Sequence, residues 1–383
     1  MYILGFLLLL GPLITLHELG HYLVGRWFGV GAQAFAVGFG KEVAGFTDKR
    51  GTRWKLCALP LGGYVQFKGD MNPASVPQAQ DDAVFGAATE DMLEEEADRD
   101  VVGASFHRAA LWKRALIVFA GPAMNILITL AIFASFFAFY GKPVAPDPVA
   151  QMTVAEFQDI SPAREAGMQV GDRIVAVSGK RIETFSQVQD EIGLYPGRTL
   201  DVTVLRGGTE LTMAVPVRTV EQEDNFGNTF KTGMIGIVRG GGQMEFVDAG
   251  IGESLVMSVT HSVRIVDMMV TGIVQIFTGE RSLKELGGPV KIAKYSGEQL
   301  SLGPLAFINF VALISLNLAF INLLPIPALD GGHLAFYAAE AVRRKPVGAR
   351  GQEVAYRAGM ALVLLLMIFV TFNDLVSLPI FGS

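Results

Sequence analysis

The residues His17-Glu18-Leu19-Gly20-His21 stand in the middle of an apolar stretch near the N-terminus. Positions i and i+4 share one face of a helix, so the imidazoles of His17 and His21 can bind one zinc ion. Glu18 stands beside them, where a carboxylate can take a proton from zinc-bound water. Ionisable side chains inside a membrane helix are costly and usually functional. We therefore interpret these residues as a catalytic metal site and not as a structural pairing of buried side chains.

The composition indicates a membrane protein. Of the 383 residues, 51% are hydrophobic and 18% are charged, whereas soluble domains carry about 25% charged residues. The mild net charge of −6 argues against nucleic acid as a partner. Cys57 is the single cysteine, so the chain can form no internal disulfide. These features favour a polytopic membrane protein that carries a soluble insert.

Four stretches are long and apolar enough to cross a bilayer, which takes about 20 helical residues. We predict membrane-spanning helices at residues 1–30, 112–141, 303–342 and 357–378. The first stretch lacks a basic n-region and a small-residue cleavage site, so we expect a retained helix and not a signal peptide. Lysines and arginines gather between the first two and between the last two spans, and such residues favour the cytoplasmic side. Both termini and residues 142–300 are then expected outside the cytoplasm.

Residues 31–69 are predicted to form short strands with turns between them. Within this region we expect a hairpin at Arg53–Lys68, turning at Pro60–Gly63, whose edge has unpaired backbone groups. Residues 70–111 are predicted to be an acidic cytoplasmic loop, because residues 70–103 hold ten acidic residues and one arginine.

Residues 252–279 carry valines on one helical face and Ser, His, Arg and Asp side chains on the opposite face. This pattern favours a helix lying in the membrane interface. We therefore predict an interfacial amphipathic helix and loop at residues 252–300. A span here would invert the orientation of everything that follows it.

Residues 145–220 are predicted to form a small α/β domain. It should contain a helix at Phe185–Gly193 and a hairpin around Arg206–Thr209, followed by returning strands at residues 221–251. Its segment Ser161–Ile174 resembles a bacterial PDZ domain, and such domains bind extended peptides by strand addition. The resemblance implies a peptide ligand, and the other interpretation is a spacer that only covers the entrance to the site.

A catalytic zinc needs a third protein ligand and leaves a fourth position for water. Asp330 is the best candidate, because the third span should bring it to the same membrane side as His21. His333 lies one turn later and is the competing ligand. Two prolines before Asp330 break the helix, which suits a cavity that admits water, although they could also simply end the helix.

These motifs together resemble the site-2 protease family of intramembrane zinc metalloproteases, in its bacterial regulator-of-sigma-E-protease type. Besides the HExxH helix and the PDZ segment, the resemblance rests on four further motifs: Ala58–Val65, Ala120–Asn125, Gly287–Val290 and Asn322–Asp330. It implies that one zinc ion per chain is bound by His17, His21 and Asp330. It also implies that Glu18 is the general base.

The resemblance further implies a re-entrant β-sheet at residues 34–68, whose edge presents a strand to the substrate. The substrate-binding residues expected there are Tyr64, Val65 and Phe67. Asn322 is expected to contact the substrate backbone near the metal.

The predicted fold class is a polytopic α-helical membrane protein with four transmembrane helices, a small re-entrant β-sheet and an inserted α/β PDZ-like domain. The predicted activity is hydrolysis of peptide bonds in or near the spans of single-span proteins, during regulated intramembrane proteolysis. By resemblance, the substrate is an anti-sigma factor or a remnant signal peptide. The expected location is the bacterial inner (plasma) membrane, with the active site toward the cytoplasm and the PDZ domain and both termini in the periplasm.

Two alternatives come from other functional classes. A catalytically inactive scaffold would bind membrane helices or peptides through its PDZ domain, but it would not need the intact His-Glu-His set. A metal transporter would need Asp and His residues recurring along several spans, and the sequence lacks that pattern.

Overall fold

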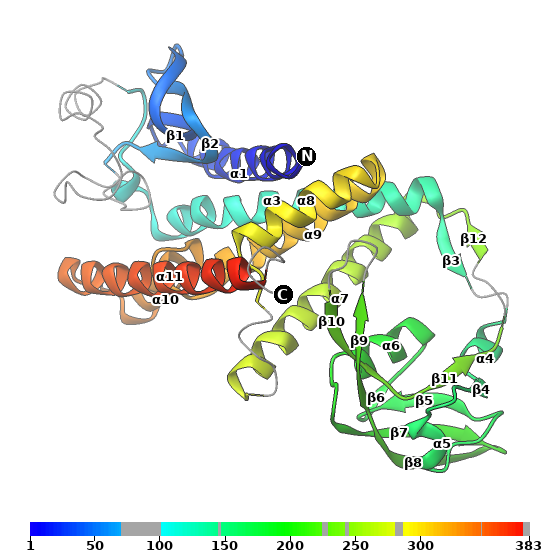
Figure 1. Cartoon of the computed structure of the whole chain (residues 1–383). Helices are drawn as coiled ribbons and strands as arrows, with labels where there is room; N and C mark the ends of the chain where they lie inside the picture. The colour runs from blue at the N-terminus through cyan, green and yellow to red at the C-terminus, as the bar shows by residue number, and fades with distance from the viewer. Residues whose placement is uncertain are drawn as a thin grey trace. The chain divides into compact units, whose positions relative to one another are not determined.

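The computed structural model describes residues 1–69, 101–144, 147–223, 229–241, 245–279, 286–345 and 347–377. The chain divides into two compact units (Figure 1). The first unit comprises Met1–Phe133 and Ser282–Ser383, and the second comprises Ala134–Arg281. Most of the predicted acidic loop, residues 70–100, lies outside the described residues.

Within the described residues, four helices are long and apolar enough to cross a membrane. They are α1 (Tyr2–Trp27), α3 (Leu111–Tyr140), α9 (Pro304–Leu323) and α11 (Ala349–Ser377). Large apolar side chains on their outer faces are exposed, for example Leu365 and Phe372 of α11. Because water would make this exposure costly and lipid would not, these helices confirm the expected integral membrane protein.

The third span is shorter than predicted. The expected helix at 303–342 is two helices, since α9 ends at Leu323 and α10 (Asp330–Arg343) begins after a break. Pro325 and Pro327 explain the break, because proline has no backbone N–H to continue the helical ladder.

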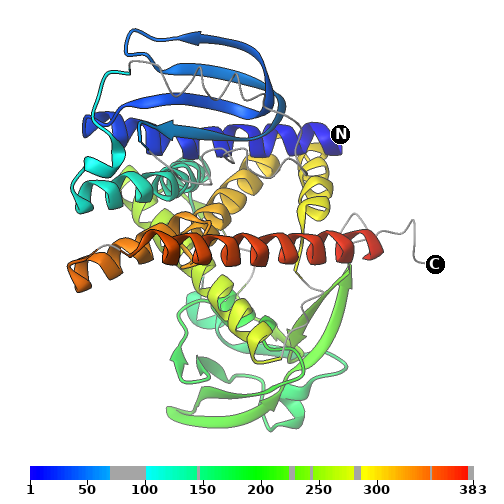
Figure 2. The ribbon, with the colours of Figure 1, turned by 90° about the vertical axis from the view of Figure 1, so that its left-hand side faces the viewer.

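A small β-sheet packs against α1 in the first unit (Figure 2). It is built from two long, bent strands, β1 (Ala32–Thr47) and β2 (Arg53–Phe67), each of which contributes two pieces. The pieces follow the order 63–67, 32–39, 53–59, 42–47 across the sheet. The short 3-10 helix η1 (Phe106–Arg108) contacts the end of this sheet. The Phe106 N–H donates a hydrogen bond to the Lys68 carbonyl at 2.8 Å.

The predicted hairpin at Arg53–Lys68 is wrong. Residues 53–59 and 63–67 do not pair with each other, because both pair with residues 32–39, one on each side. Within the described residues, piece 63–67 therefore has a strand partner on one side only, and it forms an edge of the sheet. An apolar cluster that includes Tyr22, Phe35, Phe67 and Ile117 joins this sheet to α1 and α3.

A helix also occupies part of the region predicted as a loop after the amphipathic helix. Helix α8 (Pro289–Ser301) packs against α1, and its first backbone N–H groups are capped from another segment. The buried Asp374 of α11 accepts hydrogen bonds from the N–H groups of Gly288 and Lys291, each at 3.0 Å. Since a carboxylate also complements the positive end of the helix, Asp374 stabilises the start of α8.

The second unit contains a four-stranded antiparallel sheet of order β6-β5-β7-β8. These strands are β5 (Arg173–Val177), β6 (Lys180–Arg181), β7 (Thr199–Arg206) and β8 (Thr209–Pro216). Three two-stranded sheets pair β3 (Lys142–Val144) with β12 (Glu245–Val247), β4 (Val154–Phe157) with β11 (Ile237–Arg239), and β9 (Arg218–Glu223) with β10 (Thr229–Met234). Its short helices are α4 (Pro148–Gln151), α5 (Pro162–Glu165) and α6 (Phe185–Gly193).

The sequence predicted two elements of this unit closely. The hairpin around Arg206–Thr209 is the β7–β8 pair, and the predicted helix is α6. Asp172 is 1% exposed and accepts hydrogen bonds from Arg206 at 2.6 and 2.7 Å. Hydrogen bonds from the Arg206 side chain hold the pKa of Asp172 below its usual value. This pair holds the end of β7 against the turn before β5.

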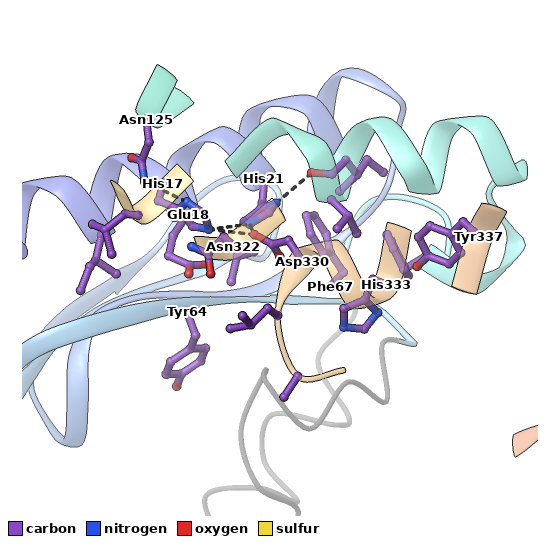
Figure 3. A pocket seen from close by; sticks show the side chains of 18 residues that line it. His17, Glu18, His21, Tyr64, Phe67, Asn125, Asn322, Asp330, His333 and Tyr337 are labelled. Carbon is purple, nitrogen blue, oxygen red and sulfur yellow. Dashed lines mark hydrogen bonds and ion pairs between the residues drawn. The ribbon is translucent and has the colours of Figure 1, made fainter. Parts of the chain in front are cut away.

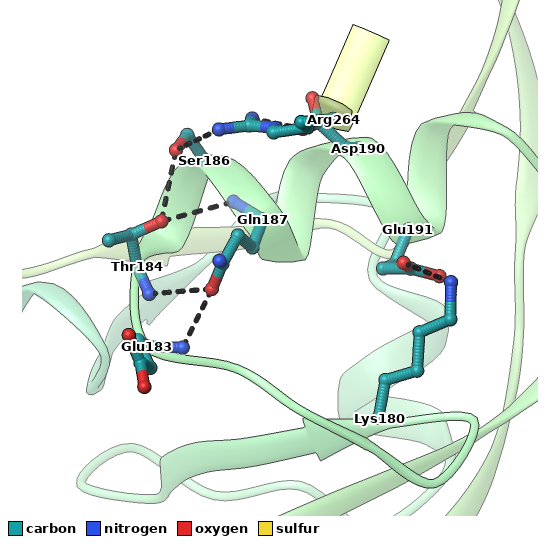
Figure 4. A network of polar contacts seen from close by, with 8 residues as sticks. All are labelled: Lys180, Glu183, Thr184, Ser186, Gln187, Asp190, Glu191 and Arg264. Carbon is teal, nitrogen blue, oxygen red and sulfur yellow. Dashed lines mark hydrogen bonds and ion pairs between the residues drawn. The ribbon is translucent and has the colours of Figure 1, made fainter. Parts of the chain in front are cut away.

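The predicted amphipathic helix is α7 (Ile251–Phe277), and it belongs to the second unit. Its polar face is bound to α6, since Arg264 pairs with Asp190 and also contacts Ser186 (Figure 4). Helix α6 is itself fixed by a capping box between Thr184 and Gln187. The opposite face of α7 leaves apolar side chains exposed, among them Val256, Val259, Val263 and Phe277.

Candidate metal centre

Three predicted ligands converge at one point in the first unit (Figure 3). The Nε2 atoms of His17 and His21 are 3.2 Å apart. One carboxylate oxygen of Asp330, Oδ2, lies 3.1 Å from the first nitrogen and 3.6 Å from the second. All three side chains are at least four-fifths buried.

This donor set fits a zinc ion. Zinc bonds to His nitrogen and carboxylate oxygen are about 2.0–2.2 Å long, so ligand atoms of a tetrahedral site lie roughly 3.3 Å apart. The three measured separations lie around that value. Asp330 Oδ2 is also buried without a hydrogen-bond partner, which would be costly unless a cation faces it. Three ligands leave one tetrahedral position for water or substrate, as in catalytic sites.

Helix α1 presents the motif as its spacing predicts. His17 and His21 are one turn apart, and Glu18 lines the same cavity. Glu18 also lies against the edge piece of the sheet, since a Cβ at Gly63 would be 3.6 Å from its Cγ. The carboxylate therefore lies between the ligands of α1 and the edge of the sheet.

Asp330 reaches the site through the break between α9 and α10. It is the first residue of α10, where the helix dipole favours a carboxylate. Ala328 just before it has a positive φ of 93°, a strained conformation for a residue with a side chain. Gly331 follows it, and a Cβ there would lie 2.2 Å from the Leu324 carbonyl oxygen. The tight fold of this segment thus accounts for the Asp-Gly pairing in the sequence.

His333, the competing ligand, lines the cavity but lies outside the converging group. Its Nδ1 is 2.6 Å from the hydroxyl of Tyr356 in α11. The geometry therefore favours Asp330 over His333 as the third ligand.

Helix α3 forms the back of the site, and sequence reasoning missed this role. The Nδ1 of His21 donates to the Ile117 carbonyl at 2.8 Å. Asn125 contacts the Nδ1 of His17 at 3.3 Å. Gly121 lies between them, and a Cβ there would be 2.2 Å from His21 Nε2 and 2.7 Å from His17 Nε2. A Gly-Pro pair and an Asn inside an apolar span were the available signal.

The cavity at the site has a volume of about 300 Å³. Its lining includes the four residues predicted to contact substrate: Tyr64, Val65, Phe67 and Asn322. Figure 3 shows the Asn322 side chain beside Glu18 and Asp330. Helix α1 lies on one side of these residues and the sheet on the other. All four residues thus line the cavity that holds the metal ligands, although the Tyr64 ring points away from the ligands in Figure 3.

Apolar helices that enclose a His-His-Asp cluster, with a carboxylate beside it, define a membrane-embedded metalloprotease. The model of peptidase family M50 matches residues 5–366. The chain belongs to this family, the site-2 protease family, and is a zinc metalloprotease.

Relatives along the whole chain agree with this assignment. The chain is 44% identical to a protein of Agrobacterium fabrum named "putative zinc metalloprotease", over 98% of this chain and 96% of the relative. A protein of the same name from Mesorhizobium japonicum is also 44% identical, over 97% of each chain. "Metalloprotease MmpA" of Caulobacter vibrioides is 32% identical, over 97% of this chain and 95% of the relative.

Proposed function

We propose that this protein hydrolyses peptide bonds in or near the membrane spans of single-span proteins, as a step of regulated intramembrane proteolysis. The observation that carries the proposal is the position of the donor cluster. His17, Glu18 and His21 lie within an apolar helix that is long enough to span a bilayer, in its C-terminal half. A protease with its ligands at that place is built to act on bonds that lipid shields from soluble proteases.

The roles follow from the contacts at the site. His17, His21 and Asp330 would hold the zinc ion, which supplies Lewis acidity toward the scissile carbonyl and the attacking water. Glu18 accepts the proton of that water and donates it to the leaving amine nitrogen. Val65, on the edge piece of the sheet, lines the cavity together with Glu18.

Substrate access is proposed to use the edge of the sheet. A helical substrate hides its backbone groups in its own hydrogen bonds, so it must unwind before cleavage. Piece 63–67 is an edge that lies beside Glu18 and can offer those groups new partners. Tyr64, Val65 and Phe67 would line the bound strand, and the Asn322 amide would bond to its backbone.

The second unit is proposed to be a PDZ domain outside the cytoplasm. Its α6 helix, its antiparallel sheet and the Ser161–Ile174 segment support this assignment, and a peptide ligand would add to a sheet edge. We propose that α7 lies in the membrane interface, because its exposed valines match that environment. The physiological substrate would be an anti-sigma factor or a remnant signal peptide in the bacterial inner membrane.

Cleavage of a single-span model protein in lipid vesicles tests the proposed activity. We expect cuts within or near the span, loss of cleavage after zinc is removed with a chelator, and recovery when zinc is restored. A Gly or Pro in the substrate helix should speed cleavage, because Gly costs about 1 and Pro about 3 kcal/mol in a helix. Binding of the span without zinc-dependent cleavage would instead support the inactive scaffold.

Single-cysteine labelling tests the proposed orientation. Ser186 in the second unit and Glu353 at the start of α11 are both exposed. With Cys57 replaced by serine, a cysteine at 353 should react with a membrane-impermeant reagent only from the cytoplasmic side. A cysteine at 186 should react only from the periplasmic side. Reaction of both from the same side would contradict the arrangement of four spans.

A further inference from the structure

Asn125 is a fully buried polar residue on α3 that directly contacts a metal ligand. Its side-chain nitrogen, Nδ2, lies 3.3 Å from the Nδ1 atom of His17. Its side-chain oxygen is buried with no hydrogen-bond partner. A buried amide oxygen without a partner is costly, so this residue needs an explanation beyond packing.

Metal coordination determines which amide orientation is correct. When His17 binds zinc through Nε2, its other ring nitrogen carries the proton and becomes a donor. The oxygen and nitrogen of an amide are told apart only by their hydrogen-bond partners. Turning the Asn125 amide by 180° places its oxygen at the position that accepts this N–H. Without this turn, the N–H of a zinc-bound His17 would face the amide N–H₂, one donor against another.

The backbone of Asn125 is held in place by two buried hydroxyl groups. Thr129 Oγ1, one turn along α3, donates to the Asn125 carbonyl at 3.0 Å, and Ser315 Oγ of α9 donates to it at 2.9 Å. All three residues are fully buried. These two hydrogen bonds fix the backbone of Asn125 where α3 and α9 meet. A residue that positions a metal ligand needs such a fixed backbone.

His21 is oriented in a matching way. Its Nδ1 donates to the Ile117 carbonyl, two helical turns before Asn125 on α3. The Nδ1 atoms of both imidazoles therefore contact α3. His21 contacts a backbone carbonyl there, and His17 contacts a side-chain amide. Such outer partners fix the ring orientation and increase the affinity of the ligand for the metal.

We propose that Asn125 is a positioning residue that accepts the Nδ1 proton of His17 and so strengthens zinc binding. This proposal deepens the proposed function, because it rests on His17 being a zinc ligand. Asn125 itself touches neither the metal nor the substrate. Ile117 cannot be tested by side-chain substitution, since its backbone carbonyl makes the contact, whereas Asn125 can.

The test measures zinc affinity of the purified full-length protein by competition with a chromophoric chelator. Asn125→Leu removes the acceptor at similar volume and should weaken zinc binding by about 10–100-fold. Asn125→Asp keeps an acceptor oxygen and should bind zinc at least as tightly as the wild type. Thermal unfolding of the zinc-free proteins is measured alongside, so that a loss of packing is seen separately.

Phe133→Leu is the matched control, because Phe133 is a buried side chain of the same helix, two turns beyond Asn125, and is not among the residues that line the cavity. It should unfold at a lower temperature and keep the wild-type zinc affinity. Unchanged affinity in Asn125→Leu would overturn the proposal, and so would an equal loss in Asn125→Asp or Phe133→Leu. Failure of the proposed function would be seen separately, as a wild-type protein that binds zinc but cleaves no membrane span.

Discussion

Replacing Glu18 with glutamine is expected to abolish proteolysis while leaving the zinc ion in place. Glutamine has nearly the same shape as glutamate, so it can occupy the same place in the cavity. It cannot accept the proton of the attacking water, and general acid–base catalysis contributes about 10²–10⁴-fold to a rate. Glu18 is not among the three converging ligands, so zinc binding does not depend on it.

The measurement pairs a cleavage assay on a single-span substrate with metal analysis of the same sample. Glu353→Gln is a suitable control, because it makes the same chemical change at an exposed position of α11. His17→Ala and Asp330→Ala should lose zinc and cleavage together. Cleavage by the Glu18→Gln protein at the wild-type rate would show that another group moves the proton.

Replacing Gly121 with alanine is expected to remove zinc from the protein. The added methyl group would lie 2.2 Å from one ligand nitrogen, that of His21, and 2.7 Å from the other, that of His17. These separations are far below van der Waals contact, so the imidazoles must move away from each other or from Asp330. Alanine is about 1 kcal/mol better than glycine in a helix, so helix propensity itself does not weaken α3.

Gly11→Ala provides the matched control for this substitution. Gly11 also lies inside an apolar span, α1, and no atom lies within 4 Å of its Cβ position. We expect this variant to keep one zinc ion per chain and full cleavage. Zinc content and circular dichroism are measured for both variants. A full zinc content in Gly121→Ala would show that a methyl group at position 121 does not displace the two imidazoles.

Features set by local pattern were predictable from the sequence. The apolar runs predict the four spans, and the i, i+4 spacing of His17 and His21 places both imidazoles on one face of α1. The capping residues of α6 and the turn residues before Thr209 act on their immediate neighbours. The convergence of Asp330 with the HExxH motif was expected from the direction of the third span, and the structure brings the three ligands together.

Features that depend on contacts between distant segments were not predictable in this way. Helix α8 receives its N-terminal cap from Asp374, which is 86 residues away from Gly288, so no local signal marks its start. Residues 53–59 and 63–67 look like a hairpin around a turn, yet each finds a better partner in residues 32–39. The role of Asn125 depends on His17, a residue of another helix 108 positions earlier.

The division of the chain into two units has a consequence for how such an enzyme can diversify. Every described residue that lines the cavity belongs to the first unit, although the second unit interrupts it in the sequence from within α3 to a point before α8. Selection can therefore alter, enlarge or duplicate the insert without disturbing the zinc ligands or their supports on α3. The zinc site stays under one set of constraints, while the inserted unit evolves under another.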